Sequence, residues 1–180
     1  MSAAHSMDER RVMNERAQRL ARRKSHQEQR QVTAEIIVVG VGRQRFGLPV
    51  NGVAEIVRRP PLTPLPGLPD HLPGLAVVRG QLFCTVDLGH WLGATRAPGA
   101  AAGYLVLLEA QGGRPLGLLV SRVEGLREVY ADEVAEHLAR DRAEERRPVS
   151  FTTRDLVAVL DLAQLIEHPD IARTAEGVSR

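Results

Sequence analysis

Cysteine, aromatic side chains and long apolar runs are all scarce here, and each scarcity excludes a class of protein. Cys84 is the single cysteine in 180 residues, so no intramolecular disulfide framework can form. Aromatic residues make up 3% of the chain, which argues against the stacking platforms that bind single-stranded nucleic acid. No apolar run approaches the ~18–20 residues that span a bilayer, and no secretory signal is evident. We therefore expect a cytoplasmic chain without direct membrane insertion.

What is present is an aliphatic composition sufficient for a folded core. Hydrophobic residues make up 43% of the sequence, and the length favours one domain, with or without a tail. The net charge of +2 is unevenly distributed. The segment from Asp8 to Gln31 carries +4, which leaves about −2 for the remainder. This distribution indicates a basic tail rather than a basic globular face for DNA.

The N-terminal segment, residues 1–33, is predicted to be a charged helical extension. It contains neither glycine nor proline before Val32. Met13, Ala17 and Leu20 recur at helical spacing and form a thin apolar stripe. One helix from about residue 7 to residue 29 follows from this pattern. It is either solvated or docked, on a partner or on the domain's own surface.

Beyond residue 34 the pattern becomes that of β-strands. Two apolar runs, Ile36–Val39 and Phe46–Val50, are separated by turn residues and predict a hairpin. The proline-rich stretch 60–73 excludes a helix and a central strand. Strand character returns in Leu75–Leu88, around a turn at Arg79–Gln81.

An internal repeat gives the strongest information on architecture. The segment Phe46–Ile56 recurs 70 residues later as Leu116–Leu126, and both fit the pattern [F/L]-G-L-x-V-x-x-V-x-x-[I/L]. A second pair, Val86–Leu92 and Leu160–Ile166, is offset by 74 residues. Because both pairs run in the same order, the chain holds two copies of one β-rich unit.

The repeat divides the domain, residues 34–170, into two subdomains of roughly 34–100 and 101–170, followed by a disordered tail, 171–180. A β unit of that size buries only about 60% of its unfolded surface and is marginal alone. We therefore expect two small barrels that share an apolar interface, with a groove where they meet.

Two pairs of residues in the repeats have predicted local roles. Gly47 and Gly117 begin matching strands, where a missing side chain allows a close backbone approach or a bulge. Asp87 and Asp161 each end an apolar strand and suit the N-cap of a short helix.

These motifs, in this order, resemble the CheW-like domain family. The residues that carry the resemblance are Val53-Ala-Glu55-Ile56, the stretch Gly74–Gly80 after the proline-rich linker, and Val86-Asp87-Leu88. The resemblance covers about residues 34–169. It implies a mainly β fold of two SH3-like five-stranded barrels packed together, with short helices.

The resemblance also implies a function. Members are non-catalytic scaffolds without cofactors, which couple the cytoplasmic tip of a chemoreceptor (a methyl-accepting chemotaxis protein) to a CheA-type histidine kinase. In the family, the receptor binds in the groove between the halves and the kinase binds a face of one barrel. The protein-binding candidates carried over by motif position are Val53, Glu55, Gly74, Arg79, Gly80, Gly117, Val123 and Leu126.

Each candidate also has a structural interpretation. The three apolar residues could belong to the core, and the three glycines could supply turns or bulges. Glu55 and Arg79 could form an ion pair within the first barrel instead of contacting a partner.

Three departures from the family pattern concern partner identity. Val77 occupies the position of a usual asparagine, and Ser121 that of a usual aspartate. A charged run, Arg140–Arg147, stands near the C-terminus where many members have a Gly-containing hairpin strand. A member dedicated to one receptor or one kinase pathway would fit these changes.

Signatures of catalysis and metal binding are absent from the sequence. Gly40-Val-Gly42 lacks the third glycine of a dinucleotide loop. The six histidines show no metal-ligand spacing, and Cys84 has no cysteine partner. No P-loop, nucleophile elbow or kinase motif occurs. The sequence therefore predicts neither an enzyme nor a metalloprotein.

Two alternative functions remain open at this stage. One is an SH3-like-barrel protein that binds nucleic acid through its basic helical arm, and steep salt dependence would mark it. The other is a protein that imitates the kinase's own CheW-like regulatory domain and competes with it.

Overall fold

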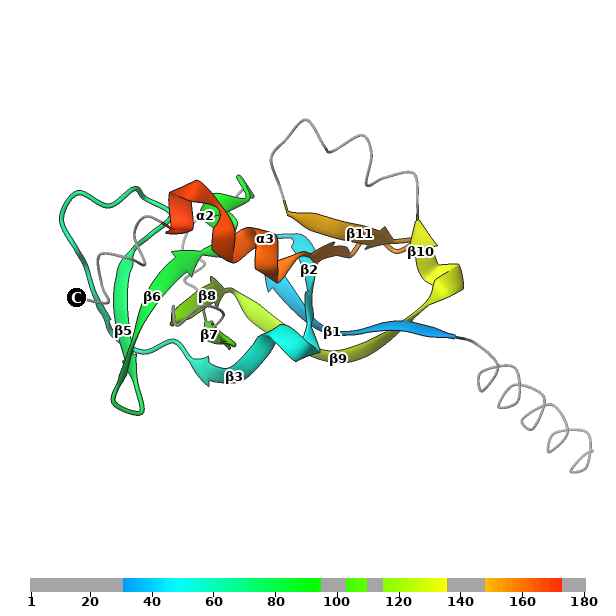
Figure 1. Cartoon of the computed structure of the whole chain (residues 1–180), viewed down its shortest axis with the longest axis horizontal. Coiled ribbons are helices and arrows are strands. Elements are labelled where there is room, and N and C mark those ends of the chain that lie inside the picture. The colour runs from blue at the N-terminus through cyan, green and yellow to red at the C-terminus, as the bar shows by residue number, and fades with distance from the viewer. Residues whose placement is uncertain (1–30, 95–102, 110–114, 136–147, 173–180) are drawn as a thin grey trace, which may run out of the picture.

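The computed structural model describes residues 31–94, 103–109, 115–135 and 148–172, which form two sheets and a few short helices (Figure 1). The terminal sheet contains β1 (Val32–Val41), β2 (Gln44–Pro49), β9 (Arg122–Tyr130), β10 (Val134–Ala135), β11 (Val149–Thr153) and β12 (Ala158–Leu160). The central sheet contains β3 (Val53–Arg58), β4 (Leu62–Thr63), β5 (Gly74–Val78), β6 (Gln81–Asp87), β7 (Tyr104–Leu108) and β8 (Leu116–Val120). The helices are η1 (Val50–Gly52), α2 (Leu88–Trp91), η3 (Ala131–Glu133) and α3 (Leu162–Glu167). The predicted mainly β class is confirmed.

The two sheets have the same internal arrangement. Their strand orders are β10-β11-β12-β2-β1-β9 and β4-β5-β6-β8-β7-β3. Each contains one parallel pair, β2 with β12 and β8 with β6, and the other pairs are antiparallel. Each sheet also has a two-residue edge strand, β10 or β4, beside five longer strands. The predicted five strands per barrel therefore correspond to the five longer strands of each sheet.

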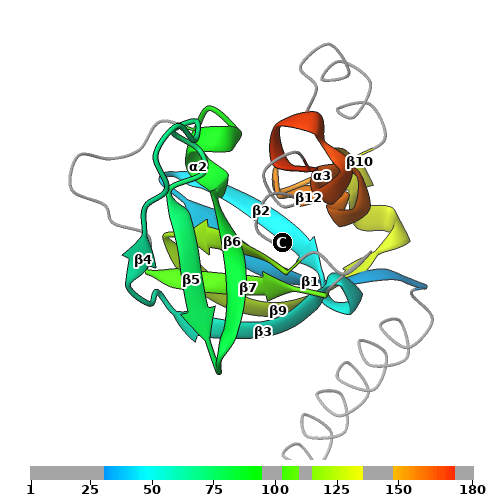
Figure 2. The same ribbon diagram turned by 60° about the vertical axis from the view of Figure 1, so that its left-hand side comes forward.

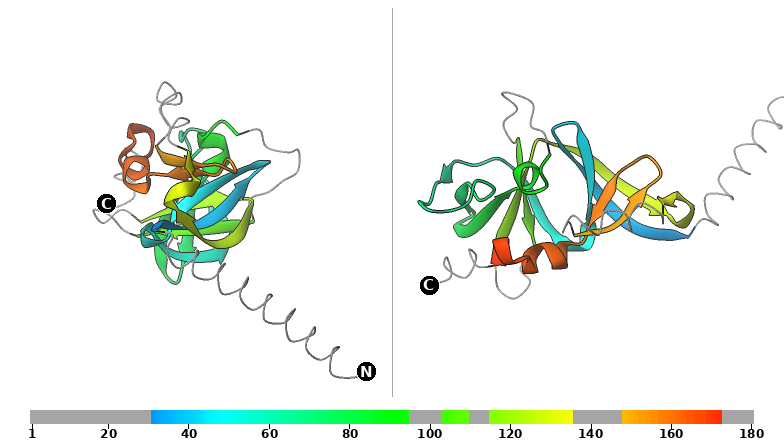
Figure 3. Two further views of the ribbon diagram at one scale, coloured as in Figure 1. Left: turned by 90° about the vertical axis from the view of Figure 1, so that its right-hand side faces the viewer. Right: turned by 90° about the horizontal axis from the view of Figure 1, so that it is seen from above.

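The repeated motif marks the points where the chain changes sheet. Within 46–56 the chain leaves β2 of the terminal sheet and enters β3 of the central sheet. Within 116–126 it makes the opposite change, from β8 to β9. Each half of the sequence thus gives its first hairpin to the sheet of the other half, and Figure 3 shows the two sheets side by side.

Both expected subdomains, 34–100 and 101–170, therefore contribute strands to both sheets. After each crossover the next strand pairs with a strand of the other repeat, β3 with β7 and β9 with β1. The expected extension and tail each meet the fold at their inner ends. β1 already begins at Val32, and Ile171 is 1% exposed in the core. Residues 1–30, with the predicted helix, and residues 136–147 and 173–180 lie outside the described residues.

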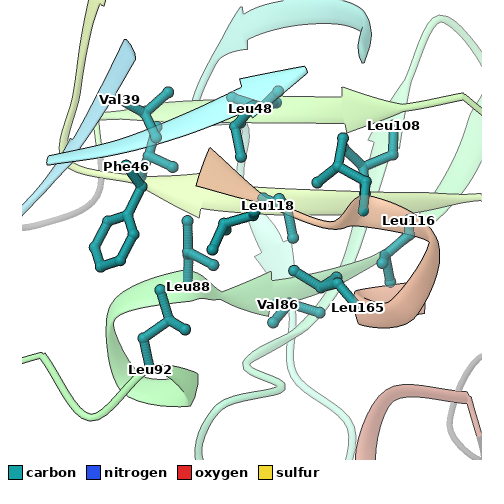
Figure 4. Packing of buried hydrophobic residues seen from close by; sticks show 14 of the residues in the cluster. Val39, Phe46, Leu48, Val86, Leu88, Leu92, Leu108, Leu116, Leu118 and Leu165 are labelled. Carbon is teal, nitrogen blue, oxygen red and sulfur yellow. The ribbon is translucent and has the colours of Figure 1, made fainter. Parts of the chain in front are cut away.

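The core has three parts. The interior of the central sheet holds Ala76, Phe83, Leu105, Leu107 and Leu119, and that of the terminal sheet holds Ile36, Val38, Val129, Val157 and Val159. The third part, here called the shared core, joins the two sheets. It includes Val39 and Leu48 of the terminal sheet, Val86 and Leu118 of the central sheet, and Leu165 of α3 (Figure 4). The predicted apolar interface between two barrels is therefore present.

The local predictions hold where the structure tests them. The β1–β2 hairpin forms, and the proline-rich stretch contains no helix, only the two-residue strand β4. A Cβ on Gly47 would lie 2.8 Å from Ile36 Cδ1, and one on Gly117 would lie 2.7 Å from Leu105 Cδ1. Both glycines therefore allow a close approach across the sheet.

The two aspartates cap helices as predicted. Asp87 Oδ1 accepts a hydrogen bond from His90 N at 3.0 Å, which caps α2. Asp161 Oδ1 accepts one from Gln164 N at 3.0 Å, which caps α3. Each cap satisfies a backbone donor that the first turn of a helix leaves unpaired.

Candidate protein-docking site

β5 and β6 form a hairpin of the central sheet (Figure 2). Arg79 lies in the turn at its tip. Arg79 and Gly80 have φ angles of 49° and 80°, and Val78 pairs with Gln81 across them. A two-residue turn with both φ angles positive matches the twist of the flanking strands. Gly80 therefore serves the turn, as its structural interpretation predicted, and Arg79 is held at the tip with its side chain 79% exposed.

An ion pair links this tip to β3. Arg79 Nη2 donates a hydrogen bond to Glu55 Oε1 at 2.7 Å, and the Glu55 side chain is 30% exposed. The predicted intramolecular pair thus exists. The ion pair uses only part of the hydrogen-bonding capacity of the guanidinium. Arg79 makes one hydrogen bond to the described residues, whereas a guanidinium has five N–H donors. An exposed pair of this kind contributes only about 0–1 kcal/mol to stability.

Gly74 has a structural role at the start of β5. Its φ of +135° is one that L side chains rarely adopt, and a Cβ there would meet the carbonyl oxygen of Thr63. Its own carbonyl accepts a hydrogen bond from Thr85 Oγ1 at 2.6 Å, inside the sheet. Gly74 therefore allows β4 and β5 to pack closely. Because it is buried and has no side chain, it offers little surface to a partner.

The three apolar candidates occupy different environments. Val53 and Val123 are half-buried and pack against the shared core. Leu126 is 67% exposed on β9, where it faces Ile37 across the ladder. Among the three, Leu126 presents the most apolar surface to solvent. The structure brings Glu55, Arg79 and Gly80 together on the central sheet, whereas Val123 and Leu126 lie on the terminal sheet.

The terminal sheet has a matching ion pair of opposite polarity, which sequence reasoning missed. Its β11–β12 turn carries Asp155, whose Oδ2 accepts hydrogen bonds from Arg127 of β9 at 2.8 Å and from Arg45 of β2 at 3.2 Å. The corresponding β5–β6 turn carries a cation, Arg79, paired with an acid on β3, Glu55. Only the 74-residue offset of the repeat could have indicated that these two turns correspond.

Sequence reasoning also missed a pair of exposed apolar side chains, Val77 and Leu82, beside Arg79. The run Leu75–Val78 is apolar at every position, so the alternation that would mark the outward face is absent.

The ion pair at Asp155 predicts a pH-dependent contribution to stability. The hydrogen bond from Arg127 lowers the pKa of Asp155 from 3.8 to about 2, although partial burial opposes the shift. A depressed folded-state pKa means that the stabilisation is present above pH 4 and is lost as the pH falls toward 2. Asp155→Asn should therefore melt lower than the wild type at pH 7, and the difference should narrow between pH 4 and pH 2. Thermal melts of both proteins check this. A gap that stays constant across that range would contradict it.

Two barrel-like sheets around one shared core, with charged hairpin turns at the surface, define a two-sheet β-rich domain. The structure superimposes on the crystal structure of the scaffolding protein TtCheW from Thermoanaerobacter tengcongensis, with a TM-score of 0.64 and 20% identity. That match covers 76% of this chain and 94% of the other. A comparison with curated proteins gives no match. The family model of the CheW-like domain matches residues 35–170, and the chain belongs to that family.

Proposed function

We propose that this protein is a non-catalytic adaptor of bacterial chemosensory signalling, which couples the cytoplasmic tip of a chemoreceptor to a CheA-type histidine kinase. Family membership over residues 35–170 supports the adaptor class. The observation that carries the proposal is the position of Arg79, which lies at a family motif and is 79% exposed in the two-residue turn between β5 and β6. Such an adaptor acts in the cytoplasm, next to membrane receptor arrays. Within the described residues, no helix is long and apolar enough to cross a membrane.

The geometry indicates how the turn would act on a partner. Glu55 holds one edge of the Arg79 guanidinium through its 2.7 Å contact, which restricts the side chain before a partner arrives. The remaining donors can then bind a carboxylate or a carbonyl with little further loss of rotamer entropy. Charged groups at the rim of an interface mainly select the partner, while buried apolar anchors supply affinity.

Arg79→Ala should weaken the binding of at least one partner without unfolding the protein. A hydrogen bond to a charged group contributes about 1.5–3 kcal/mol, so we expect a loss of about tenfold or more in affinity. Because the ion pair is exposed, the free energy of unfolding should change by no more than about 1 kcal/mol. The measurement is a pull-down of the host's CheA-type kinase and of a receptor cytoplasmic fragment, with a thermal melt of each variant.

Arg43→Ala provides the matched control, since Arg43 is also an exposed arginine in a hairpin turn, here between β1 and β2. It should bind both partners like the wild type. If the wild type captures neither partner under conditions where an established scaffold binds both, the adaptor function is wrong. If Arg79→Ala instead lowers the melting temperature by several degrees, the ion pair is structural.

A further inference from the structure

The β5–β6 hairpin carries apolar side chains that the described part of the chain leaves exposed to solvent. Val77 is 61% exposed and Leu82 is 39% exposed, and the two are cross-strand partners. Among the exposed large apolar side chains of the described ranges, they alone are paired in this way. Val77, Leu82 and Arg79 are here called the hairpin patch.

The hairpin patch continues the surface on which the two sheets meet. The next pair inward on the same face of the hairpin, Leu75 with Cys84, packs into the shared core. Successive side chains on one face of a strand are two residues apart, so Val77 and Leu82 extend that apolar row outward. At its inner end this row is buried in the shared core. At its outer end, at Val77 and Leu82, no described residue covers it.

The patch also has a defined charge. Arg79 follows Val77 by two residues, and its hydrogen bond to Glu55 is the one it makes within the part of the chain that the structure describes. An apolar pair beside a single cation suits an apolar side chain that lies next to a carboxylate. It suits nucleic acid poorly, because the hairpin patch contains one arginine, which is paired with Glu55, and phosphate binding needs several cations.

Val77 determines the chemistry of the hairpin patch. A polar side chain at this position would offer hydrogen bonds to a partner. Valine offers none and adds apolar area, so a polar partner group opposite it would be left unpaired. Val77 therefore favours one partner chemistry and disfavours another.

We propose that the hairpin patch selects a protein partner that presents an apolar side chain beside a carboxylate, with Val77 as the residue that sets this choice. The proposal rests on the adaptor function and names the chemistry of one of its contacts. Val77 and Leu82 supply the apolar anchor. Arg79, oriented by Glu55, binds the carboxylate.

The test measures the affinity of the full chain for the kinase's regulatory domain and for the receptor fragment, each by calorimetry. Val77→Asn replaces the first apolar side chain of the patch with an amide, and Leu82→Gln does the same for the second. Each should weaken the binding of one of the two proteins by about tenfold, as truncation of an interface anchor does. Val32→Asn is the matched control, because Val32 is a 46% exposed valine on a strand of the terminal sheet. It should change neither affinity.

The combination with Arg79→Ala tests whether one partner surface covers the whole patch. The double variant Val77→Asn with Arg79→Ala should lose less affinity than the two single losses combined, since neighbouring contacts are coupled. Val77→Thr, which keeps the shape of valine and replaces one methyl group with a hydroxyl, takes the place of Val77→Asn if that variant melts early.

The outcomes separate this proposal from the adaptor function. Wild-type binding of both proteins, with Val77→Asn and Leu82→Gln within twofold of it, overturns the patch and leaves the adaptor. Binding of neither protein by the wild type overturns the adaptor and, with it, the patch. Equal weakening by Val32→Asn would overturn the patch as well, since it would show that any polar side chain on an exposed strand lowers the affinity.

Discussion

Gly74→Ala is expected to lower the free energy of unfolding by about 3 kcal/mol or more, because two separate obstacles meet at this residue. Its φ of +135° is unfavourable for any side chain, and a Cβ would meet the backbone of Thr63 and Pro64. Backbone atoms of a paired strand cannot move aside as a flexible side chain can. For a domain of this size the loss corresponds to a fall of roughly 6–12 °C in melting temperature.

Gly80→Ala isolates the first of the two obstacles. Gly80 also has a positive φ, +80°, but a Cβ there would find no heavy atom within 4 Å. Its cost should be about 1–2 kcal/mol, the ordinary penalty of the left-handed region. Thermal or urea unfolding of the two variants measures the difference. Equal losses would mean that β4 does not lie against β5 as the structure shows.

Leu165→Ala should produce the second large effect, because Leu165 belongs to the core that joins both sheets. Its side chain is 0% exposed, and Figure 4 shows it directed into the same core as Val86 and Leu116 of the central sheet. Truncation of a buried leucine to alanine removes apolar contacts and leaves a cavity, which costs about 2–5 kcal/mol. Leu165→Met, which conserves volume, should cost less than about 1.5 kcal/mol.

The single tryptophan offers a local readout of the same variant. Trp91 of α2 meets the ring of His168, at the end of α3, edge to face with the centroids 5.3 Å apart. If α3 loosens when Leu165 is truncated, the surroundings of Trp91 change and its fluorescence emission should shift. A loss of stability with unchanged native-state emission would show that the cavity leaves α3 in place.

The local features of the fold could be predicted because each depends on residues that are close in the sequence. Asp87 and Asp161 cap helices that begin at the next residue, and the amide that each one binds lies three residues away. The turn at Arg79–Gln81 could be predicted because Gly80 accepts the positive φ that it adopts there. Such signals act over a few residues and survive in any tertiary context.

The surroundings of the binding candidates could be predicted only in part. Glu55 and Arg79 form the ion pair that their structural interpretation described, and the structural interpretations of Gly74, Gly80 and Gly117 account for their geometry. Their contact with a partner stays a prediction. The exposure of Val77 could not be predicted from an apolar run, because the sequence does not show how far along the hairpin the neighbouring sheet reaches.

The β-rich class, the twofold repeat, the hairpins and the helix caps can all be inferred from the sequence, since composition and short-range spacing encode them. The exchange of first hairpins between the repeats, with β2 beside β12 and β8 beside β6, depends on the packed fold. The choice of partners in the two ion pairs, Glu55 with Arg79 and Arg127 with Asp155, depends on it as well. The partners in each of these pairings are 24 residues or more apart in the chain, and long-range partners are selected by the free energy of the whole packed domain.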